Sequence, residues 1–533
     1  MKDKGILLGF VNFDRPSPKT NTIEVLVLPD KVKHLKINRF VKIENNFLKN
    51  KFYIGRVVEG PFFQPEEVER NSALAQITIL HGENFPAPPD YFASYLIELV
   101  GVWDNNMLIH SGMRPVPQSK IYSLTLDEIN KILDLASGDL FVGNLDGYPD
   151  IKVKIDSNKI SILPRNVGIF GTVGSGKTNS SQVLIEELVR KGWAVIVLDV
   201  EGEYTLMDQP NEMPHEVESL KELNLKPEGI KDFFVAKLSG QEATAEKVSD
   251  VTIRIDQIDP EVLVELIEAT EPQAAALMSI IYNFKSRRAR SNEEAEEGDF
   301  ITPGKNQSGY SLEQIIKAID QYDPKELNVG RSSLMPLKRK LIRLRNTGAF
   351  DDKAANIIDP YQFMKNGYLM VFDISVTGDY EKNLLTAQIL SRIFKAKLND
   401  KKNELPHTMV VIEEAHTFIS RDNQKRMYET MRMLKEIARR GRKRWLALAF
   451  VSQQPSHIPG EIFELCNTRI IHNIRSARNL EVLKVSSGDI SEEIWNTVPT
   501  LDVGRALING PQFRRHSPIV KFRFPLTKRR KNE

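Results

Sequence analysis

The chain has 533 residues, of which 41% are hydrophobic and 27% are charged. That composition is typical of a globular protein, and the length, too great for a single core, indicates about three domains. With 73 basic and 71 acidic residues the formal net charge is +2, which excludes a strongly basic chain but not local basic patches.

The cysteine content and the apolar runs restrict the cellular setting. Cys466 is the single cysteine, which excludes an internal disulfide framework and a multi-cysteine metal site and is typical of a reducing compartment. The first residues lead into a short apolar run and do not resemble a signal peptide. No apolar run approaches the roughly 20 residues that span a bilayer. We therefore expect a soluble cytoplasmic protein with no membrane partner.

Residues 1–150 are predicted to form a small N-terminal β-barrel domain followed by a linker. A helix is predicted near Leu126, with Thr125 as its N-cap and Glu128 completing a capping box. Gly143–Gly147 is predicted to be a turn-rich link to the next domain. The barrel prediction rests on short runs rich in β-branched and aliphatic residues at 5–11, 22–28, 40–43, 53–58, 74–80 and 95–102.

The most informative stretch is Gly171–Thr178, which reads GTVGSGKT and matches the P-loop pattern GxxxxGK[ST]. A strand-like run precedes it and an apolar-striped helix follows, as phosphate binding requires. Lys177 is expected to reach the β- and γ-phosphates of ATP, and the Thr178 hydroxyl to bind Mg²⁺. An incidental glycine-rich loop is a poor alternative, because every fixed position and both flanking elements agree. The predicted nucleotide contacts are Gly171, Thr172, Val173, Gly174, Ser175, Gly176, Lys177, Thr178 and Asn179.

The rest of the chain predicts an α/β fold with a parallel-sheet core in residues 151–205 and 361–515. Residues 206–360 are predicted to be a mainly helical insertion, and residues 516–533 a C-terminal segment ending in a solvated basic tail. The core prediction rests on buried strand-like runs at 193–199, 368–373, 408–412, 445–451 and 469–474.

Three features are predicted within the insertion. Residues 260–284 have helical apolar spacing. Residues 291–299 are predicted to be an acidic surface loop, and residues 332–345 a basic amphipathic helix with Pro336 near its start.

A second strong pattern is the apolar strand Thr408–Ile412 followed by Glu413 and Glu414, typical of a Walker B motif. Glu413 is expected to hold Mg²⁺ together with Thr178, and Glu414 to polarise the attacking water. Most P-loop enzymes have aspartate at the first position, so Glu413 moves the carboxylate by one methylene. The alternative is an ordinary strand that ends in a surface turn.

Two weaker patterns follow other predicted strands. Gln453 is placed to hydrogen-bond the γ-phosphate or the water, although a plain polar turn before Pro455 is an equal alternative. Asp199, Glu201 and Glu203 could meet Mg²⁺ or its waters, and loop capping is an equal alternative for them.

The segment Ala438–Arg444 carries a dense positive cluster that includes Arg439, Arg440 and Arg442. One of these arginines could stabilise the transition-state charge on the γ-phosphate, in its own or a neighbouring subunit. Contact with DNA phosphates and a solvated charged face are the two alternatives.

Together these motifs resemble the HerA-type ATPases, and the resemblance covers nearly the whole chain. The segment Asp199–Tyr204 departs from the family's common DPHGEY, and Arg165-Asn166 stands where Arg-His is common. Neither departure removes a phosphate or Mg²⁺ group. The motifs that carry the resemblance are Gly143–Gly147, GTVGSGKT, DVEGEY, VVIEEAH, ARRGRKRW, SQQP, Cys466–Arg469 and Val498–Ala506.

The resemblance implies a RecA-like P-loop core in a homo-hexameric ring that hydrolyses ATP and pumps double-stranded DNA. It also implies a NurA-type nuclease or another effector as partner, in DNA end processing and repair or in anti-phage defence. Two alternatives stay open: a nucleotide-dependent assembly scaffold that activates an effector, and a conjugation- or secretion-type ATPase. Candidate pore contacts are Arg421, Lys425 and Arg426, with Lys338, Arg339 and Lys340 as a second set.

Overall fold

The computed structural model describes residues 5–13, 21–27, 29–44, 51–65, 91–296, 309–321, 331–417, 428–488, 490–513 and 515–530. The chain forms two compact units and passes between them several times along its sequence. The first unit contains residues 1–158, 171–176 and 468–523, and the second contains residues 159–170, 177–467 and 524–533. This division differs from the expected boundaries after residues 150, 205, 360 and 515, because segments far apart in the sequence fold together.

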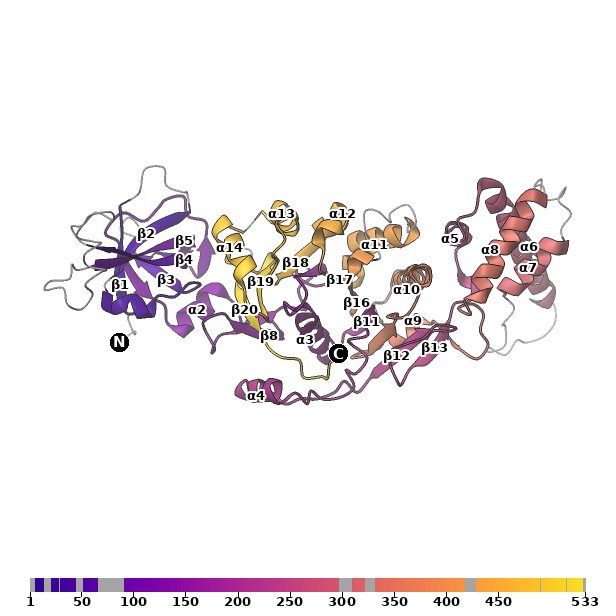
Figure 1. The fold of residues 1–533 in the computed structure, drawn as a ribbon, viewed down its shortest axis with the longest axis horizontal. Coiled ribbons are helices and arrows are strands. Elements are labelled where there is room, and N and C mark those ends of the chain that lie inside the picture. Colours follow the sequence, from indigo (N-terminus) through magenta and orange to yellow (C-terminus); the bar gives the residue numbers. More distant parts are fainter. Residues whose placement is uncertain are drawn as a thin grey trace, which may run out of the picture. The chain divides into compact units, whose positions relative to one another are not determined.

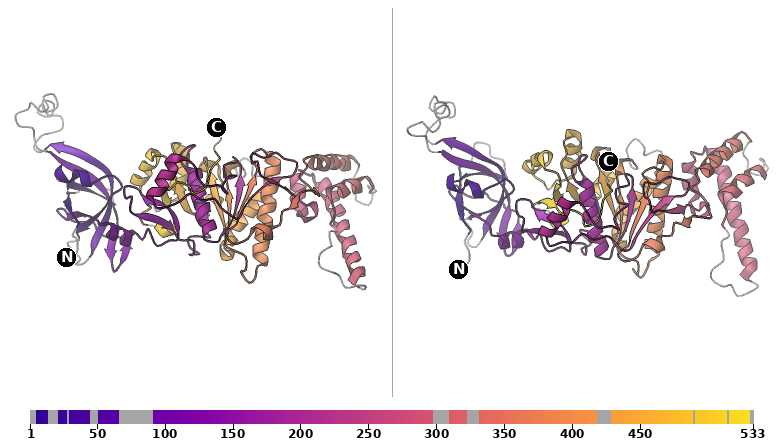
Figure 2. Two further views of the ribbon diagram at one scale, coloured as in Figure 1. Left: turned by 90° about the horizontal axis from the view of Figure 1, so that it is seen from below. Right: turned by 60° about the horizontal axis from the view of Figure 1, so that its bottom comes forward.

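The first unit contains the predicted β-barrel (indigo in Figures 1 and 2). Its strands pair in the order β2-β1-β7-β3-β4-β5, and β2 also pairs with β5, which closes the ring. Closure leaves no unpaired edge within the ring. The predicted strand at 74–80 lies outside the described residues. The strands are β1 Leu7–Val11, β2 Thr22–Val27, β3 Phe40–Glu44, β4 Phe52–Pro65, β5 Tyr91–Asp104, β6 Met107–Ile109, which pairs with β5, and β7 Lys120–Ser123.

The barrel interior is built by alternation along its strands. In β2, Ile23, Val25 and Val27 are buried while the residues between them are partly exposed. These side chains belong to an apolar cluster drawn from the barrel strands. A shift of one residue would turn the apolar set outward, so the pattern fixes the register of the strand.

Arg56 of β4 ties the barrel to the C-terminal part of the same unit. Its guanidinium is 2% exposed and lies 2.9 Å from the Glu98 carboxylate. Its Nη1 also donates to the carbonyl oxygens of His516 and Ser517, at 2.9 and 3.1 Å. A buried charge is tolerated when it is paired and hydrogen-bonded in this way. Arg56 therefore connects the barrel rigidly to residues 516 and 517 of the same unit.

The helix predicted after the barrel is confirmed as α2 (Leu126–Leu133), with the capping box between Thr125 and Glu128 in place. The turn predicted at Gly143–Gly147 is wrong in its first half, because β8 (Leu140–Leu145) continues to Leu145 and pairs with β9 (Lys152–Ile155) and β20 (Ile519–Phe522). A Cβ at Gly143 would lie 2.2 Å from the Lys521 carbonyl oxygen. This glycine therefore serves close strand approach, not a turn.

The remaining strands of the first unit continue this antiparallel pairing. Their order is β18-β19-β20-β8-β9, with β18 (Cys466–Ile471) pairing with β19 (Arg505–Asn509). The expected C-terminal segment beginning at residue 516 thus includes a sheet strand, β20. Two helices, α13 (Ala477–Ser486) and α14 (Glu492–Thr497), lie between β18 and β19 in the sequence.

The second unit contains the predicted parallel sheet, in the order β14-β13-β12-β15-β11-β16-β17-β10. Every residue of β11, β15, β16 and β17 is buried, as expected where helices cover both faces of a parallel sheet. The strands are β10 Asn166–Phe170, β11 Ala194–Asp199, β12 Phe233–Leu238, β13 Ser249–Thr252, β14 Asn356–Ile357, β15 Leu369–Asp373, β16 Thr408–Ile412 and β17 Leu446–Ser452.

The helices of this unit that lie outside the insertion separate the parallel strands in the sequence, as crossover connections do. They are α3 Lys177–Arg190, α9 Pro360–Phe363, which begins at the last residue of the insertion, α10 Asp379–Asn399, α11 Tyr428–Arg440 and α12 Gly460–Glu464. In the described part of the chain, none of the helices combines the length and the apolar character needed to cross a bilayer.

The insertion is only partly helical. Strands β12, β13 and β14 fall inside residues 206–360 and extend the parallel sheet, which sequence reasoning missed because β13 and β14 are short and carry polar residues. The helices are α4 Pro214–Glu222, α5 Pro260–Leu266, α6 Glu271–Glu296, α7 Leu312–Gln321 and α8 Arg331–Asn346.

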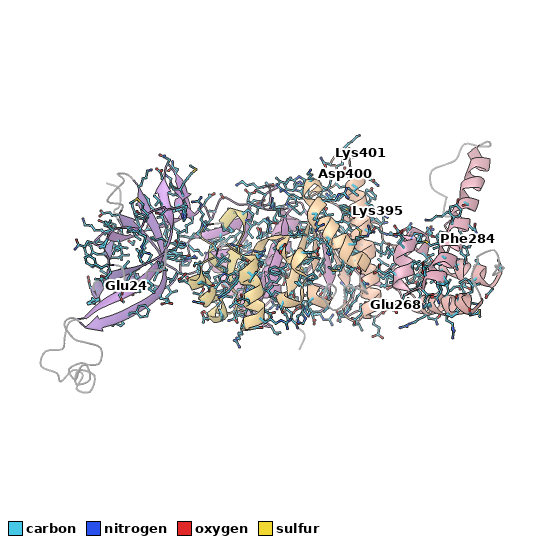
Figure 3. All side chains as sticks on the ribbon, turned by 90° about the horizontal axis from the view of Figure 1, so that it is seen from above. Glu24, Glu268, Phe284, Lys395, Asp400 and Lys401 are labelled. Carbon is cyan, nitrogen blue, oxygen red and sulfur yellow. The ribbon has the colours of Figure 1, made fainter. Side chains whose placement is uncertain are left out.

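The long helix α6 changes one prediction within the insertion. The acidic loop predicted at 291–299 is wrong over its first residues, because α6 continues to Glu296. Phe284 of α6, labelled in Figure 3, stacks on Tyr310 with the ring centroids 5.5 Å apart, a distance typical of aromatic pairs. The basic helix predicted at 332–345 is confirmed as α8, with Pro336 inside it.

Candidate active site

The P-loop turn, Gly171–Gly176, connects β10 to α3. Its backbone has positive φ angles at Gly174 (71°) and Gly176 (109°), which glycine adopts without strain. At Gly176 space is also short, because a Cβ would lie 3.1 Å from the Gly504 backbone. A strand, a turn of this conformation and a helix follow one another as the P-loop motif predicted.

The segment Val498–Ala506, which carried the resemblance without an assigned role, supports this turn from within the first unit. The Gly504 amide donates to the Ser175 carbonyl oxygen at 3.1 Å. The amide and hydroxyl of Thr172 both donate to the Asn473 carbonyl oxygen, at 2.9 and 3.0 Å. The Asn473 side chain in turn donates to the carbonyl oxygens of Pro499 and Leu501. The phosphate-binding turn is therefore held in shape by hydrogen bonds to a distant part of the sequence.

In the second unit, Lys177 opens α3 and is only 6% exposed. Burial lowers the pKa of its ammonium group, and the carboxylates of Glu414, Glu203 and Glu413 oppose that shift. The lysine therefore lies in a field of acidic side chains from the two loops that follow β11 and β16. A buried ammonium at the first turn of the P-loop helix is the group that binds phosphate oxygens in this class of site.

Glu413 follows β16 directly and is 3% exposed. Burial raises the pKa of its carboxyl group well above the ordinary value, and the adjacent Asp199 and Glu203 add to the rise. Burial also raises the pKa of Asp199, to about 6. Asp199 accepts backbone N–H bonds from Gly202, Glu203 and Tyr204, which stabilise its charge and oppose the effect of burial on its pKa.

These contacts decide between the two interpretations of Asp199 in favour of capping, since its carboxylate is occupied by the backbone of its own loop. Glu201 lies beside Glu413 through its amide, which is 3.3 Å from Glu413 Oε2. Glu203 acts through its charge on Lys177 and Glu413. The loop thus places acidic groups beside the phosphate-binding lysine.

Glu414 has a strained backbone, with φ at 41° in the left-handed region that residues other than glycine rarely adopt. Its carboxylate accepts a hydrogen bond from the Gln453 amide side chain and lies 3.1 Å from His416 Nδ1. Burial raises the pKa of this carboxyl, but His416, Gln453 and Lys177 together outweigh burial and hold the pKa below its usual value. Glu414 is therefore ionised at neutral pH, as a group that polarises water must be.

The structure brings Gln453 to Glu414, where it orients the carboxylate. Sequence reasoning placed Gln453 on the γ-phosphate or water, and missed His416 as a second orienting group. The signal for His416 was present in VVIEEAH, because a histidine two residues after a carboxylate in a tight turn can reach it. Glu414, Gln453 and His416 form one hydrogen-bonded set at the carboxyl ends of β16 and β17.

The acidic side chains suit a magnesium ion. Burial and the nearby Asp199 and Glu203 disfavour the ionised form of Glu413, and a divalent cation would favour that form. No group of three or more His, Cys, Asp or Glu side chains among the described residues could hold a metal by itself. Mg²⁺ instead keeps several waters and uses one or two protein oxygens with the nucleotide phosphates, so Thr178 and Glu413 meet its needs.

The arginine cluster lies at the other end of the sheet from Glu414. Arg442 precedes β17 and Gln453 follows it, and the seven residues of β17 separate them by about 20 Å. Arg439 is 3.8 Å from Glu461, and Arg440 pairs with Glu436.

Arg442 differs from its two neighbours in this cluster. It makes no ion pair within the described ranges and faces another cation, Arg165, whose pKa is lowered by burial and by Arg442. These arginines therefore do not reach the Glu414 carboxylate of their own chain.

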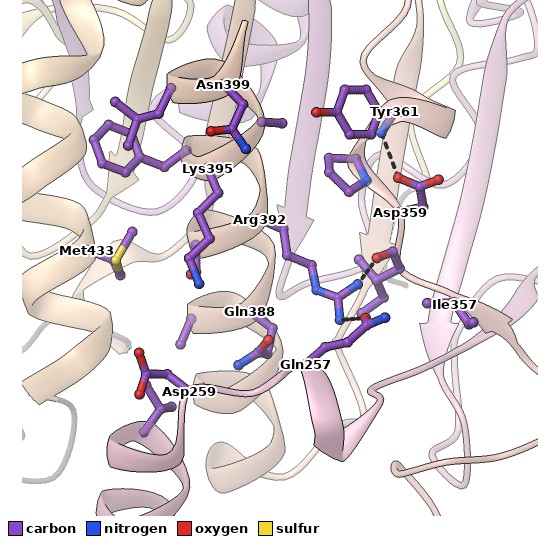
Figure 4. Close-up of a pocket in the computed structure, with 18 of the residues that line it drawn as sticks. Gln257, Asp259, Ile357, Asp359, Tyr361, Gln388, Arg392, Lys395, Asn399 and Met433 are labelled. Atoms are coloured by element: carbon purple, nitrogen blue, oxygen red, sulfur yellow. Dashed lines mark hydrogen bonds between the residues drawn. The ribbon is translucent and has the colours of Figure 1, made fainter. Parts of the chain in front are cut away.

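A cavity of about 760 Å³ lies elsewhere in the second unit, and Figure 4 shows its lining from α9, α10 and the segment before α5. Arg392 donates there to Gln257 and to the Ile358 carbonyl oxygen. None of the predicted nucleotide residues lines it. This cavity is therefore separate from the candidate active site.

A family model described as the central domain of helicase HerA matches residues 140–393. The chain is also 23% identical over 458 residues to the DNA double-strand break repair helicase HerA of Pyrococcus furiosus, covering 78% of this chain and 74% of that protein.

This chain is a P-loop ATPase that is similar to the HerA helicases.

With another relative, the similarity extends over nearly the whole length of both chains. A probable helicase of Methanocaldococcus jannaschii is 24% identical over 516 residues, covering 93% of this chain and 92% of the relative. Among solved structures, VirB4 of Thermoanaerobacter pseudethanolicus aligns with a TM-score of 0.48 and 14% identity, covering 73% of this chain and 96% of that one. The P-loop turn and the parallel sheet are thus those of an enzyme that hydrolyses ATP.

Proposed function

We propose that this ATPase is a ring-shaped motor that moves double-stranded DNA. The observation that carries the proposal is the division of its catalytic groups between the two ends of the sheet. Lys177 and the Glu414 set lie together, whereas the arginine cluster lies about 20 Å away along β17. An arginine placed in this way serves a γ-phosphate only if a neighbouring subunit presents it.

In the proposed reaction, the P-loop amides and Lys177 bind the phosphates of ATP. Thr178 and Glu413 would hold Mg²⁺, which would supply positive charge to the phosphates. Glu414, held in place by Gln453 and His416, orients the attacking water and acts as the general base that accepts its proton. The site of one subunit contains the groups that bind ATP and activate water. The arginine that completes it comes from a neighbouring subunit.

Arg442 is our choice for that cation, because Arg439 and Arg440 already pair with acidic side chains. We expect Arg442→Ala to lower turnover by about 10³-fold or more, as loss of a trans-acting arginine does, with ATP still bound. Mixing Arg442→Ala with Lys177→Ala should restore part of the activity, since some interfaces then join an intact Lys177 site to an intact Arg442.

The adjacent exposed lysine provides the control, so Lys443→Ala should retain normal turnover. The measurement is the ATPase rate of the two variants alone and mixed in several ratios. If mixing gives only the sum of the separate rates, Arg442 does not act across subunits.

Duplex DNA is the proposed cargo, supported by the similarity to proteins named as DNA double-strand break repair helicases. Of the candidate pore contacts, Arg421, Lys425 and Arg426 lie outside the described residues. In the second set, Lys338 pairs with Asp320, and Lys340 donates to Gln273 and to the Glu268 carbonyl oxygen. Arg339 is exposed on α8 and is the member of that set best placed for phosphate contact.

We further propose that the motor is a homo-hexamer and acts with a NurA-type nuclease or another effector, in DNA end processing or in anti-phage defence. The HerA-type motifs support this assignment. A nucleotide-dependent scaffold that activates an effector without moving DNA is the alternative, and the two differ in how DNA affects hydrolysis.

The test is the ATPase rate of the purified protein with and without linear duplex DNA, with the native mass measured in parallel. A motor should form a hexamer and hydrolyse ATP several-fold faster on duplex DNA. If assembled rings hydrolyse ATP at the same rate with and without every DNA tested, that result would contradict DNA as the cargo.

A further inference from the structure

The C-terminal strap, which we define as residues 524–530, ends in the first three residues of the basic run 528–531, which was predicted to be a solvated tail. In the structure it is bound to α3, the helix that begins at Lys177. The Thr527 amide and hydroxyl donate to Glu186 Oε1 at 2.8 and 2.7 Å, and Gln182 donates to the Thr527 hydroxyl at 2.7 Å. Thr527, Gln182 and Glu186 are all at most 4% exposed. These buried polar contacts fix the strap on the P-loop helix.

Other contacts hold the strap along a second segment of the chain. The Lys528 amide donates to the Gln209 carbonyl oxygen at 2.8 Å, and the Asn211 amide donates to the Leu526 carbonyl oxygen at 2.8 Å. The Asn211 side chain donates to the Pro525 carbonyl oxygen at 2.9 Å. The Lys528 side chain pairs with Glu212 at 2.9 Å. The positive charge of Lys528 is thus paired with an acidic side chain of the same chain.

The strap ends at the candidate active site. The Arg530 amide lies 3.3 Å from the Glu203 carbonyl oxygen, and the Arg530 guanidinium donates to the Thr244 carbonyl oxygen. Glu203 belongs to the loop that follows β11, and Thr244 to the loop that follows β12. One residue therefore joins two loops at the carboxyl ends of β11 and β12, which are the two strands on either side of β15.

These two loops also contact each other. A Cβ at Gly202 would lie 2.3 Å from the Thr244 hydroxyl, so the loops are tightly packed there. The Thr244 amide and hydroxyl donate to the buried Asp373 carboxylate at 2.8 and 2.9 Å. The first loop carries Glu203, whose charge acts on Lys177 and Glu413. A shift of the Thr244 loop would therefore be transmitted to the acidic groups around the catalytic lysine.

We propose that Arg530 is a positioning residue for ATP hydrolysis, which clamps the Glu203 loop and the Thr244 loop together from the end of the C-terminal strap. This inference rests on the proposed ATPase site. Arg530 contacts neither nucleotide phosphate nor Mg²⁺ in it, and acts through the placement of Glu203. Small displacements of catalytic groups reduce turnover more than they reduce binding.

The test compares Arg530→Ala, Arg530→Lys and the neighbouring Arg529→Ala. We expect Arg530→Ala to lower kcat by about 10-fold or more, with the Kd for a fluorescent ATP analogue changed by less than about two-fold. Arg530→Lys keeps a donor for the Thr244 carbonyl oxygen and should recover much of kcat. Arg529→Ala should leave kcat unchanged, because Arg529 makes no side-chain hydrogen bond or ion pair in the described part of the chain.

Hydrogen exchange separates this inference from the function it rests on. In Arg530→Ala, peptides covering residues 199–206 and 240–248 should exchange faster, whether or not the wild-type protein hydrolyses ATP. If the wild type is inactive, the proposed function fails, and the exchange data still test the clamp. Unchanged exchange, an unchanged kcat, or equal losses in the alanine and lysine variants would each overturn the positioning role.

Discussion

Replacing Glu414 by glutamine is expected to lower ATP turnover by about 10²–10⁴-fold, the contribution typical of a positioned general base. The amide keeps the shape of the side chain and its contact with Gln453 but cannot draw a proton from water. Because Lys177 and the P-loop turn are unchanged, the Kd for ATP should stay within about three-fold of the wild-type value. The measurement pairs steady-state hydrolysis with equilibrium binding of a fluorescent ATP analogue.

Glu222 at the end of α4 provides the matched control, since it is exposed and lies outside the candidate site. Glu222→Gln should behave as the wild type in both measurements. If Glu414→Gln hydrolyses ATP at the normal rate, another group activates the water and our assignment of Glu414 is wrong.

Replacing Lys177 by alanine should have a comparably large effect, but on binding first. A hydrogen bond between an ammonium and a charged phosphate contributes about 1.5–3 kcal/mol, so the Kd for ATP should rise by about 10- to 100-fold. Turnover should fall further, because Lys177 also neutralises charge in the transition state. Titration of the variant with a fluorescent ATP analogue measures the first effect, and hydrolysis at saturating ATP measures the second.

Lys191, exposed just after the same helix, is the control for loss of a lysine. Lys191→Ala should bind and hydrolyse ATP normally. Wild-type affinity in Lys177→Ala would place the phosphates elsewhere. A lower melting temperature that accounts for the whole loss would give Lys177 a structural role only.

The sequence was sufficient for those parts of the fold and site whose signals are local. The P-loop pattern, the buried run before Glu413 and Glu414, and the capping box at Thr125 each depend on residues close together in the chain. Their geometry follows from strand and helix periodicity and from hydrogen bonds within one turn. The barrel was predictable because alternation such as that of Ile23, Val25 and Val27 is a two-residue pattern.

The features that sequence reasoning missed depend on distant residues. The segment that begins at Gly143 has the composition of a turn. Only the pairing of Gly143 with β20 shows that this glycine allows two strands to approach closely. Gln453 meets Glu414 because β16 and β17 are adjacent, which no local pattern specifies. The basic run at Lys528 resembles a solvated tail until its anchor, Thr527, is seen on α3. In each case the partner lies in a segment far along the chain.

The central claim is that ATP hydrolysis moves this protein along duplex DNA, and displacement of a third strand from a DNA triplex tests it most directly. The wild-type protein with ATP should release the third strand from a linear duplex, and Glu414→Gln should bind the same DNA without releasing it. Release that needs no ATP, or assembled wild-type rings that hydrolyse ATP on the duplex without releasing the strand, would contradict the claim.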